Sequence, residues 1–285
     1  MICPTVDFKN DLYELIQANV INLTNKSIDD IYEYWRKNFD ERFPVLNTDI
    51  KIVSKKTFIS EKQNVPVTSF LLGIDFPIWF DTLNYNDIVD NKKRIMIIGI
   101  DPLRNEKSFN NFKADKSQDV IIGTPYALHN LKIRSGHTKH YWGLINKLST
   151  KHFVYLTDIY KVFFYTDISK KERSYVYYRN KHEFEKHIEL LEREIELVKP
   201  NLILILGAES YRQLFAGRQA PKLTEAVEKN VILYRNYPVL PMVHLSGSTR
   251  KKTILNFLAI NNVEFDQTKN YGEHYYKIVD NYLNS

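Results

Sequence analysis

Residues 94–106 read RIMIIGIDPLRNE, and they indicate the fold class more directly than any other part of the sequence. Its first half is a short, continuous apolar run that ends at Gly99, which is typical of a strand buried on both faces of a parallel sheet. Strands that alternate with helices predict an α/β fold of three layers, α/β/α, with a short central, mainly parallel sheet. Three further apolar runs and the clearest intervening helix complete this pattern, at 152–157, 201–206, 239–243 and about 182–198.

The first 90 residues have a different pattern. Apolar residues three or four apart predict helix over much of residues 1–45, with a second helix starting near Ser27. Residues 49–60 roughly alternate apolar and polar side chains, as short strands do. We therefore expect an N-terminal, largely helical extension over residues 1–90 and the α/β domain over residues 91–285.

Composition excludes several classes of protein. The 285 residues are 44% hydrophobic, which is too apolar for a disordered chain, and Cys3 is the only cysteine, so no disulfide scaffold is expected. No apolar run approaches the roughly 20 residues that a membrane helix needs, and early acidic residues argue against a secretory signal. We expect a cytoplasmic monomer.

The net charge of the chain is +6, which permits a polyanionic partner without requiring one.

Titratable side chains follow two of the expected strands. Asp101 comes after the first strand and is followed by Pro102, and His244 comes directly after the last. Ligands of open parallel sheets bind where the strands end. A carboxylate there can stabilise a cationic sugar and orient water, while a neutral imidazole donates a hydrogen bond to an anionic leaving group. The alternatives are that Asp101 is a turn residue and that His244 is a structural histidine.

The segment after His244 suggests a phosphate contact. Ser246, Ser248 and Thr249 are available to cap a helix that starts at Arg250, and Arg250 and Lys251 add positive charge beside the helix N-terminus. A solvated basic helix face is the alternative. The sequence has neither a dinucleotide-binding nor a P-loop motif, and its histidine spacing is poor for zinc, so no cofactor or metal is expected.

Five short segments occur in a characteristic order. They are Gly99-Ile-Asp-Pro102, residues 121–126 (IIGTPY), residues 154–158 (VYLTD), residues 202–207 (LILILG) and His244-Leu-Ser246. In this order and spacing they resemble the uracil-DNA glycosylase superfamily, in which a Gly-x-Asp/Asn-Pro loop follows the first core strand and a His-Pro-Ser loop the last. The resemblance spans about 92–265.

The resemblance implies a DNA glycosylase-like hydrolase that acts on a damaged or deaminated base, such as uracil, flipped from single-stranded or damaged DNA. Asp101 would assist water, His244 would hydrogen-bond the departing base, Tyr126 would stack on it and Asp158 would read its edge. No cofactor follows, since the iron–sulfur cluster of some branches needs four cysteines. The other implied site residues are Gly99, Ile100, Pro102 and Ser246 at the base, and Ser248, Thr249, Arg250 and Lys251 at the DNA.

Some residues depart from the family pattern. Asp158 stands where uracil-reading members carry Asn, and an ionised carboxylate only accepts hydrogen bonds, so it suits an exocyclic amine better than a uracil oxygen. Ser248 replaces the apolar wedge that fills the gap left by a flipped base. Two alternatives therefore stay open: a non-catalytic member that binds nucleic acid or a nucleotide, and a hydrolase of small N-glycosides.

Overall fold

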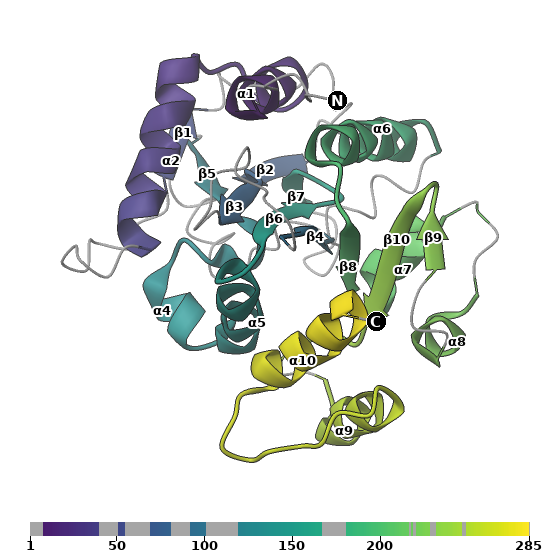
Figure 1. Cartoon of the computed structure of the whole chain (residues 1–285). Coiled ribbons are helices and arrows are strands. Elements are labelled where there is room, and N and C mark those ends of the chain that lie inside the picture. Colours follow the sequence, from purple (N-terminus) through teal and green to yellow (C-terminus); the bar gives the residue numbers. More distant parts are fainter. Residues whose placement is uncertain are drawn as a thin grey trace. The chain divides into compact units, whose positions relative to one another are not determined.

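The computed structural model describes residues 8–39, 51–54, 69–80, 92–100, 119–166, 181–216, 218, 221–228, 232–246 and 249–284. These residues belong to two compact units that are interleaved along the chain. Unit 1 comprises residues 1–77, 101–131 and 157–197, and unit 2 comprises residues 78–100, 132–156 and 198–285. The elements are labelled in Figure 1, and each unit is described by itself. The boundary expected at residue 90 stays a prediction.

Unit 2 is built on a mixed, six-stranded sheet with a parallel centre. Its strand order is β3 (Ile78–Phe80), β6 (Phe153–Asp158), β4 (Arg94–Gly99), β8 (Leu202–Leu206), β10 (Tyr237–Met242) and β9 (Ile232–Tyr234). β4, β8 and β10 are mutually parallel, whereas β3 and β9 run antiparallel to their neighbours. The four apolar runs of the sequence are therefore confirmed as four strands of one sheet, and the chain has the expected α/β fold.

The central strands are apolar because no face of them meets water. All residues of β8 are buried, as are Ile95 to Gly99 of β4, so these strands lack the alternation of half-buried strands. The helices of this unit are α4 (Leu131–Ser135, of which Leu131 belongs to unit 1), α5 (Lys139–Ser149), α7 (Ala208–Leu214), α8 (Leu223–Glu228), α9 (Lys251–Ile260) and α10 (Tyr271–Asn284).

Helices α5 and α10 pack against each other very closely. A Cβ atom on Gly272, in α10, would collide with the backbone carbonyl oxygen of His140 and lie 2.5 Å from the backbone nitrogen of Leu144, both in α5. Only glycine leaves room for this approach. The position of α5, which carries a residue of the candidate site, therefore depends on α10.

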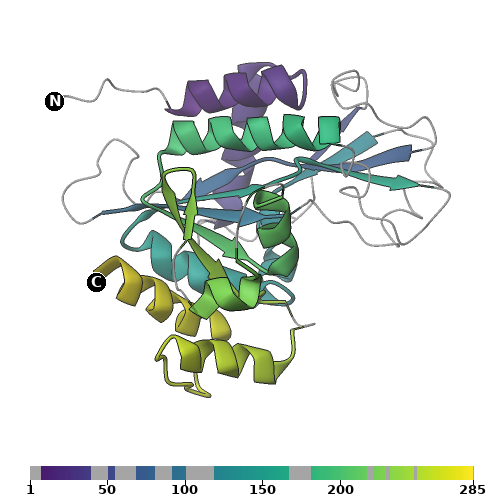
Figure 2. The same ribbon diagram turned by 90° about the vertical axis from the view of Figure 1, so that its right-hand side faces the viewer.

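Unit 1 combines the N-terminal helices with a four-stranded sheet. The sheet has the order β1 (Lys51–Ser54), β5 (Asp119–Gly123), β2 (Ser69–Asp75) and β7 (Val162–Thr166), and its helices are α1 (Phe8–Asn19), α2 (Asn25–Phe39), the short 3-10 helix η3 (Pro125–Ala127) and α6 (Lys181–Val198). Figure 2 shows α1 and α6 running side by side, in agreement with Figure 1. The helices expected near Ser27 and at 182–198 are confirmed.

The start of α9 differs from the expectation. Its N-cap residue is Arg250, and no side chain makes a capping hydrogen bond there. Thr249 instead closes a turn, since its backbone N–H donates to the carbonyl oxygen of Ser246 at 3.0 Å. Ser248 lies outside the described residues. Of the helices in the described part of the chain, none is long and apolar enough to cross a membrane.

Candidate functional site

The carboxyl ends of β4, β8 and β10 lie at one edge of the sheet in unit 2. Ile98 of β4 pairs with Ile205 of β8, and Leu206 of β8 pairs with Met242 of β10. The residues that follow these strands are therefore neighbours, as expected for parallel strands. Gly99 is the buried last residue of β4 and Ile100 is half-buried, so both lie at this edge.

Gly207, which follows β8, packs against His244, which follows β10. Gly207 has φ +98° and its N–H donates to the carbonyl oxygen of Met242 at 2.8 Å. A Cβ atom there would lie 2.9 Å from Cδ2 of the His244 ring. The imidazole thus occupies the space that any larger residue at 207 would need, and the positive φ disfavours a side chain as well.

The His244 ring has two hydrogen-bond partners, which bear on which of its nitrogens carries the proton. The backbone N–H of Ser246 donates to Nδ1 at 3.2 Å, so Nδ1 is an acceptor and the neutral ring carries its proton on Nε2. The Tyr141 hydroxyl oxygen lies 2.8 Å from Nε2 and 3.0 Å from Nδ1. In the neutral form of the half-buried imidazole, this arrangement places the Nε2–H beside the Tyr141 hydroxyl oxygen.

Tyr141 is a site residue that sequence reasoning missed. It is almost fully buried in α5, and burial raises the pKa of its hydroxyl far above the ordinary value, with a backbone hydrogen bond from Leu245 acting in the opposite direction. The hydroxyl is therefore neutral at physiological pH. Its position in sequence is one of an apolar helical stripe, so only the three-dimensional contact with His244 distinguishes it from core residues.

A short polar turn connects His244 to α9. The hydroxyl groups of Ser246 and Thr249 lie 3.4 Å apart, and both side chains are half-buried. Arg250 and Lys251 follow at the N-terminus of α9 and are exposed, with the Lys251 ammonium 5.5 Å from the centre of the Phe265 ring. The segment therefore has hydroxyl groups and positive charge close to a helix N-terminus, which are groups that commonly contact phosphates.

In unit 1, Tyr126 lies in a turn with an unusual backbone. Tyr126 has φ 58° and Ala127 has φ 50°, a left-handed conformation that is rare for residues with a side chain. The turn is closed by the Ala127 N–H, which donates to the carbonyl oxygen of Thr124 at 2.8 Å. Tyr126 itself is half-buried.

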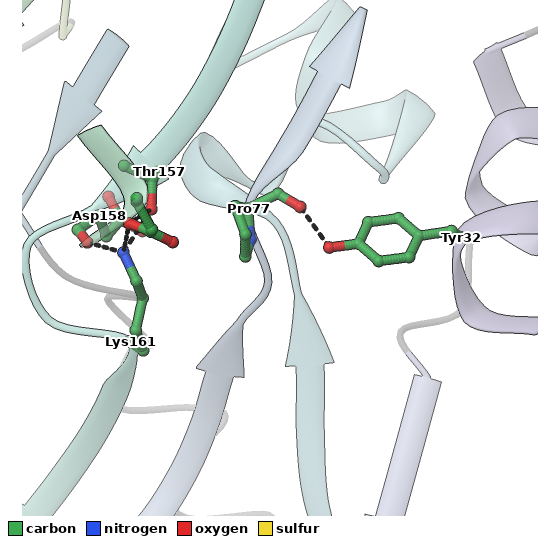
Figure 3. Close-up of polar contacts among 6 residues, drawn as sticks. Tyr32, Pro77, Thr157, Asp158 and Lys161 are labelled. Carbon is green, nitrogen blue, oxygen red and sulfur yellow. Dashed lines mark hydrogen bonds and ion pairs between the residues drawn. The ribbon is translucent and has the colours of Figure 1, made fainter. Parts of the chain in front are cut away.

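Asp158, also in unit 1, is the last residue of β6 and lies beside a buried ion pair (Figure 3). The Lys161 ammonium donates to Glu194 at 2.7 Å and also contacts the Asp158 carbonyl oxygen and the Thr157 hydroxyl. The Thr157 hydroxyl donates to Glu194 at 2.9 Å. Because the lysine and glutamate side chains are only 3% and 2% exposed, this cluster fixes the strand end that carries Asp158.

Asp101, Pro102 and Ser248 lie outside the described residues, so the pairing of Asp101 with His244 stays a prediction. Within the described ranges, no three His, Cys, Asp or Glu side chains are grouped so that they could hold a metal ion.

Comparison with known proteins is informative at the level of the family. No curated protein matches the chain. A family model, that of the uracil DNA glycosylase superfamily, matches residues 87–264, which is more than half of the chain. The match begins just before β4 and ends beyond α9, so it includes His244, Tyr126 and Asp158. The chain therefore belongs to the uracil DNA glycosylase superfamily.

Proposed function

We propose that this protein is a DNA glycosylase-like hydrolase that cleaves the N-glycosidic bond of a damaged or deaminated, uracil-like base. Family membership supports glycosylase-like chemistry in general. The observation that carries the specific proposal is the His244 ring, whose Nδ1 accepts the Ser246 N–H and whose Nε2–H is a donor at a strand end. A neutral imidazole donor is what a departing base anion requires.

The proposed reaction is a displacement at the sugar carbon C1′. The bond from C1′ to the base nitrogen breaks, its electron pair leaves with the base, and His244 stabilises that anion by donating a hydrogen bond. The Asp101 carboxylate stabilises the oxocarbenium-like sugar and orients a water molecule, whose oxygen bonds to C1′. The proton that the water loses neutralises the base, so atoms and charge balance. Gly99, Ile100 and Pro102 complete the loop around Asp101.

Tyr126 and Asp158 are proposed to recognise the base. A tyrosine ring stacked on a flipped base typically contributes about 1–3 kcal/mol. The Asp158 carboxylate accepts hydrogen bonds, so it favours a base that presents an exocyclic amine over one that presents a carbonyl oxygen. The Lys161–Glu194 pair supports this role because it fixes the backbone from which the carboxylate extends.

The proposed partner is single-stranded or damaged DNA, which the protein would bind as a monomer in the cytoplasm. Ser246, Ser248, Thr249, Arg250 and Lys251 are proposed to contact the base and the phosphates. The exposure of Arg250 and Lys251 at the N-terminus of α9 supports a backbone contact. Light scattering in solution tests the monomer directly.

Release of a base from defined oligonucleotides tests the enzymatic proposal. Single-stranded 5′-labelled oligonucleotides that each carry uracil, hypoxanthine or another altered base are incubated with the protein, and abasic sites are cleaved with alkali. We expect strand cleavage with the wild type and loss of cleavage in Asp101→Ala and His244→Asn. His137→Asn is the control and should cleave as the wild type does, because it alters an exposed histidine of the same unit as His244. No product above the Asp101→Ala background across the panel refutes the hydrolase.

A non-catalytic member that binds nucleic acid is the second candidate, and the Asp158 carboxylate in place of an amide is the observation that favours it. Such a protein would bind the same oligonucleotides with equal affinity in the wild type and in Asp101→Ala. Its affinity would fall as salt rises, since bound phosphates release counterions. Binding that salt does not weaken would exclude this candidate.

A further inference from the structure

Helix α2 contacts the segment that follows Tyr126, and both belong to unit 1. Trp35 is fully buried, and its ring centre lies 5.6 Å from that of His129, with the planes tilted by 39°. The Trp35 ring also meets Phe76 edge-on at 6.2 Å. Trp35 precedes the region matched by the superfamily, so family membership assigns it no role.

His129 fastens the two ends of the Tyr126 turn together. Its Nδ1 atom accepts the Thr124 backbone N–H at 3.2 Å, and its own backbone N–H donates to the Thr124 hydroxyl at 3.2 Å. Both residues are buried. A left-handed conformation at two successive residues with side chains persists only where the surroundings impose it. The His129–Thr124 bonds join the two ends of this turn, and the Trp35 ring packs against the imidazole that makes one of them.

A second contact of α2 reaches the two residues between β2 and β3, Phe76 and Pro77. The Tyr32 hydroxyl donates to the Pro77 carbonyl oxygen at 2.7 Å (Figure 3). The neighbouring Phe76 donates its N–H to the Gly123 carbonyl oxygen at 2.9 Å, directly before the turn begins. Tyr32 and Phe76 are also in ring contact, with centres 6.1 Å apart. One helix therefore holds the turn from both sides.

We propose that α2 is a positioning element for Tyr126, in which Trp35 acts through His129 to keep the turn in its left-handed conformation. The N-terminal segment is then part of the machinery that recognises the base, in addition to its packing in unit 1. The conformational part of this proposal stands by itself. The part concerning base recognition rests on the proposed stacking role of Tyr126.

Hydrogen exchange of the turn tests the conformational part. In Trp35→Leu, we expect the backbone amides of Thr124 and residues 126–130 to exchange at least tenfold faster than in the wild type, because the imidazole loses its packing partner. Tyr13→Phe is the matched control: it removes a hydroxyl bonded to Asp29 at 2.8 Å between α1 and α2 and leaves the turn contacts intact. His129→Phe is the second variant, should Trp35→Leu fail to fold, because it keeps an aromatic ring against Trp35 but removes the Nδ1 acceptor. Wild-type exchange of the turn in either folded variant would overturn the proposal.

A double-mutant cycle tests the recognition part. The affinity for a fluorescein-labelled single-stranded oligonucleotide that carries uracil is measured for Trp35→Leu, Tyr126→Ala and the double variant. Loss of a stacked ring predicts about fivefold weaker binding or more in Tyr126→Ala. Trp35→Leu should weaken binding in the wild-type background but not in the Tyr126→Ala background. Multiplicative losses would show that Trp35 acts elsewhere and overturn the positioning role. Unchanged binding in Tyr126→Ala would instead refute the proposed stacking, while the exchange result still decides the conformational part.

Discussion

Removing the charge of Lys161 should destabilise the protein far more than removing the whole ion pair. In Lys161→Met, the Glu194 carboxylate stays buried, at 2% exposure, and loses the ammonium 2.7 Å away, while the Thr157 hydroxyl still donates to it at 2.9 Å. Breaking a buried pair in this way typically costs about 3–5 kcal/mol, because one charge is left uncompensated. Replacing both charged residues with apolar side chains of similar volume is typically close to neutral. We therefore expect the double variant Lys161→Met/Glu194→Leu to be more stable than Lys161→Met.

Urea unfolding at neutral pH, followed by circular dichroism, measures these free energies. Arg36→Met is the matched control in the same unit, because it removes an ion pair with Glu33 whose side chains are 77% and 45% exposed. Exposed pairs contribute about 0–1 kcal/mol, so the control should change little. Our account of the cluster fails if Lys161→Met costs no more than Arg36→Met, or if the double variant is the less stable of the two.

Four further outcomes follow from the contacts described. Tyr141→Phe removes the hydroxyl group that lies 2.8 Å from Nε2 of His244. We expect kcat to fall on the order of tenfold or less, with KM unchanged. A change in KM with kcat unaffected would contradict this role of the hydroxyl. Gly207→Ala should lower the free energy of unfolding in urea by about 1–3 kcal/mol, because φ at this position is +98°. The new Cβ atom would also displace the His244 ring and lower activity. A variant as stable as the wild type would be evidence against backbone strain at residue 207. Arg250→Ala should reduce the slope of log affinity against log salt by about 0.7 for single strands, whereas an unchanged slope would remove Arg250 from the DNA contact. The free energy of unfolding should fall as pH rises above 10.0, because burial raises the pKa of several tyrosines in the folded state, Tyr13, Tyr141 and Tyr275 among them, and they then ionise first in the unfolded chain. Equal stability in urea titrations at about pH 9 and about pH 11 would contradict this prediction.

The central strands could be predicted because a strand that is buried on both faces consists almost entirely of apolar residues. β4 and β8 are short, continuous apolar runs stopped by Gly99 and Gly207, and this length with a bounding glycine favours a strand over a helix. The edge strands β3 and β9 have three residues each, too few for any periodic signal. The four-stranded sheet of unit 1 could not be predicted either, since it pairs β2 with the distant β7, and such pairing depends on contacts that local sequence does not encode.

Part of the candidate site was predictable for the same reason. His244 stands out because it follows a buried strand, and the end of a parallel strand is where ligands bind. Tyr141 does not, since its hydroxyl is the functional group of a side chain otherwise typical of a helix core. The link from Trp35 to His129 joins residues that are remote in sequence, and periodicity indicates only that Trp35 faces inward. The roles of Tyr141 and Trp35 can be recognised only from the distances and hydrogen bonds in the structure, because their residue types and positions in sequence are those of ordinary core residues.

The close approach of α5 and α10 has a practical consequence for anyone who expresses this protein. A clone trimmed to the region matched by the superfamily would stop at residue 264 and delete α10, whose Gly272 fits against the backbone around His140. Tyr141 is the residue after His140, so the truncation would remove the helix that packs against the part of α5 from which the Tyr141 side chain reaches His244. A fragment of this kind that lacks the proposed activity would therefore report the loss of α10 and would not test the chemistry proposed for His244.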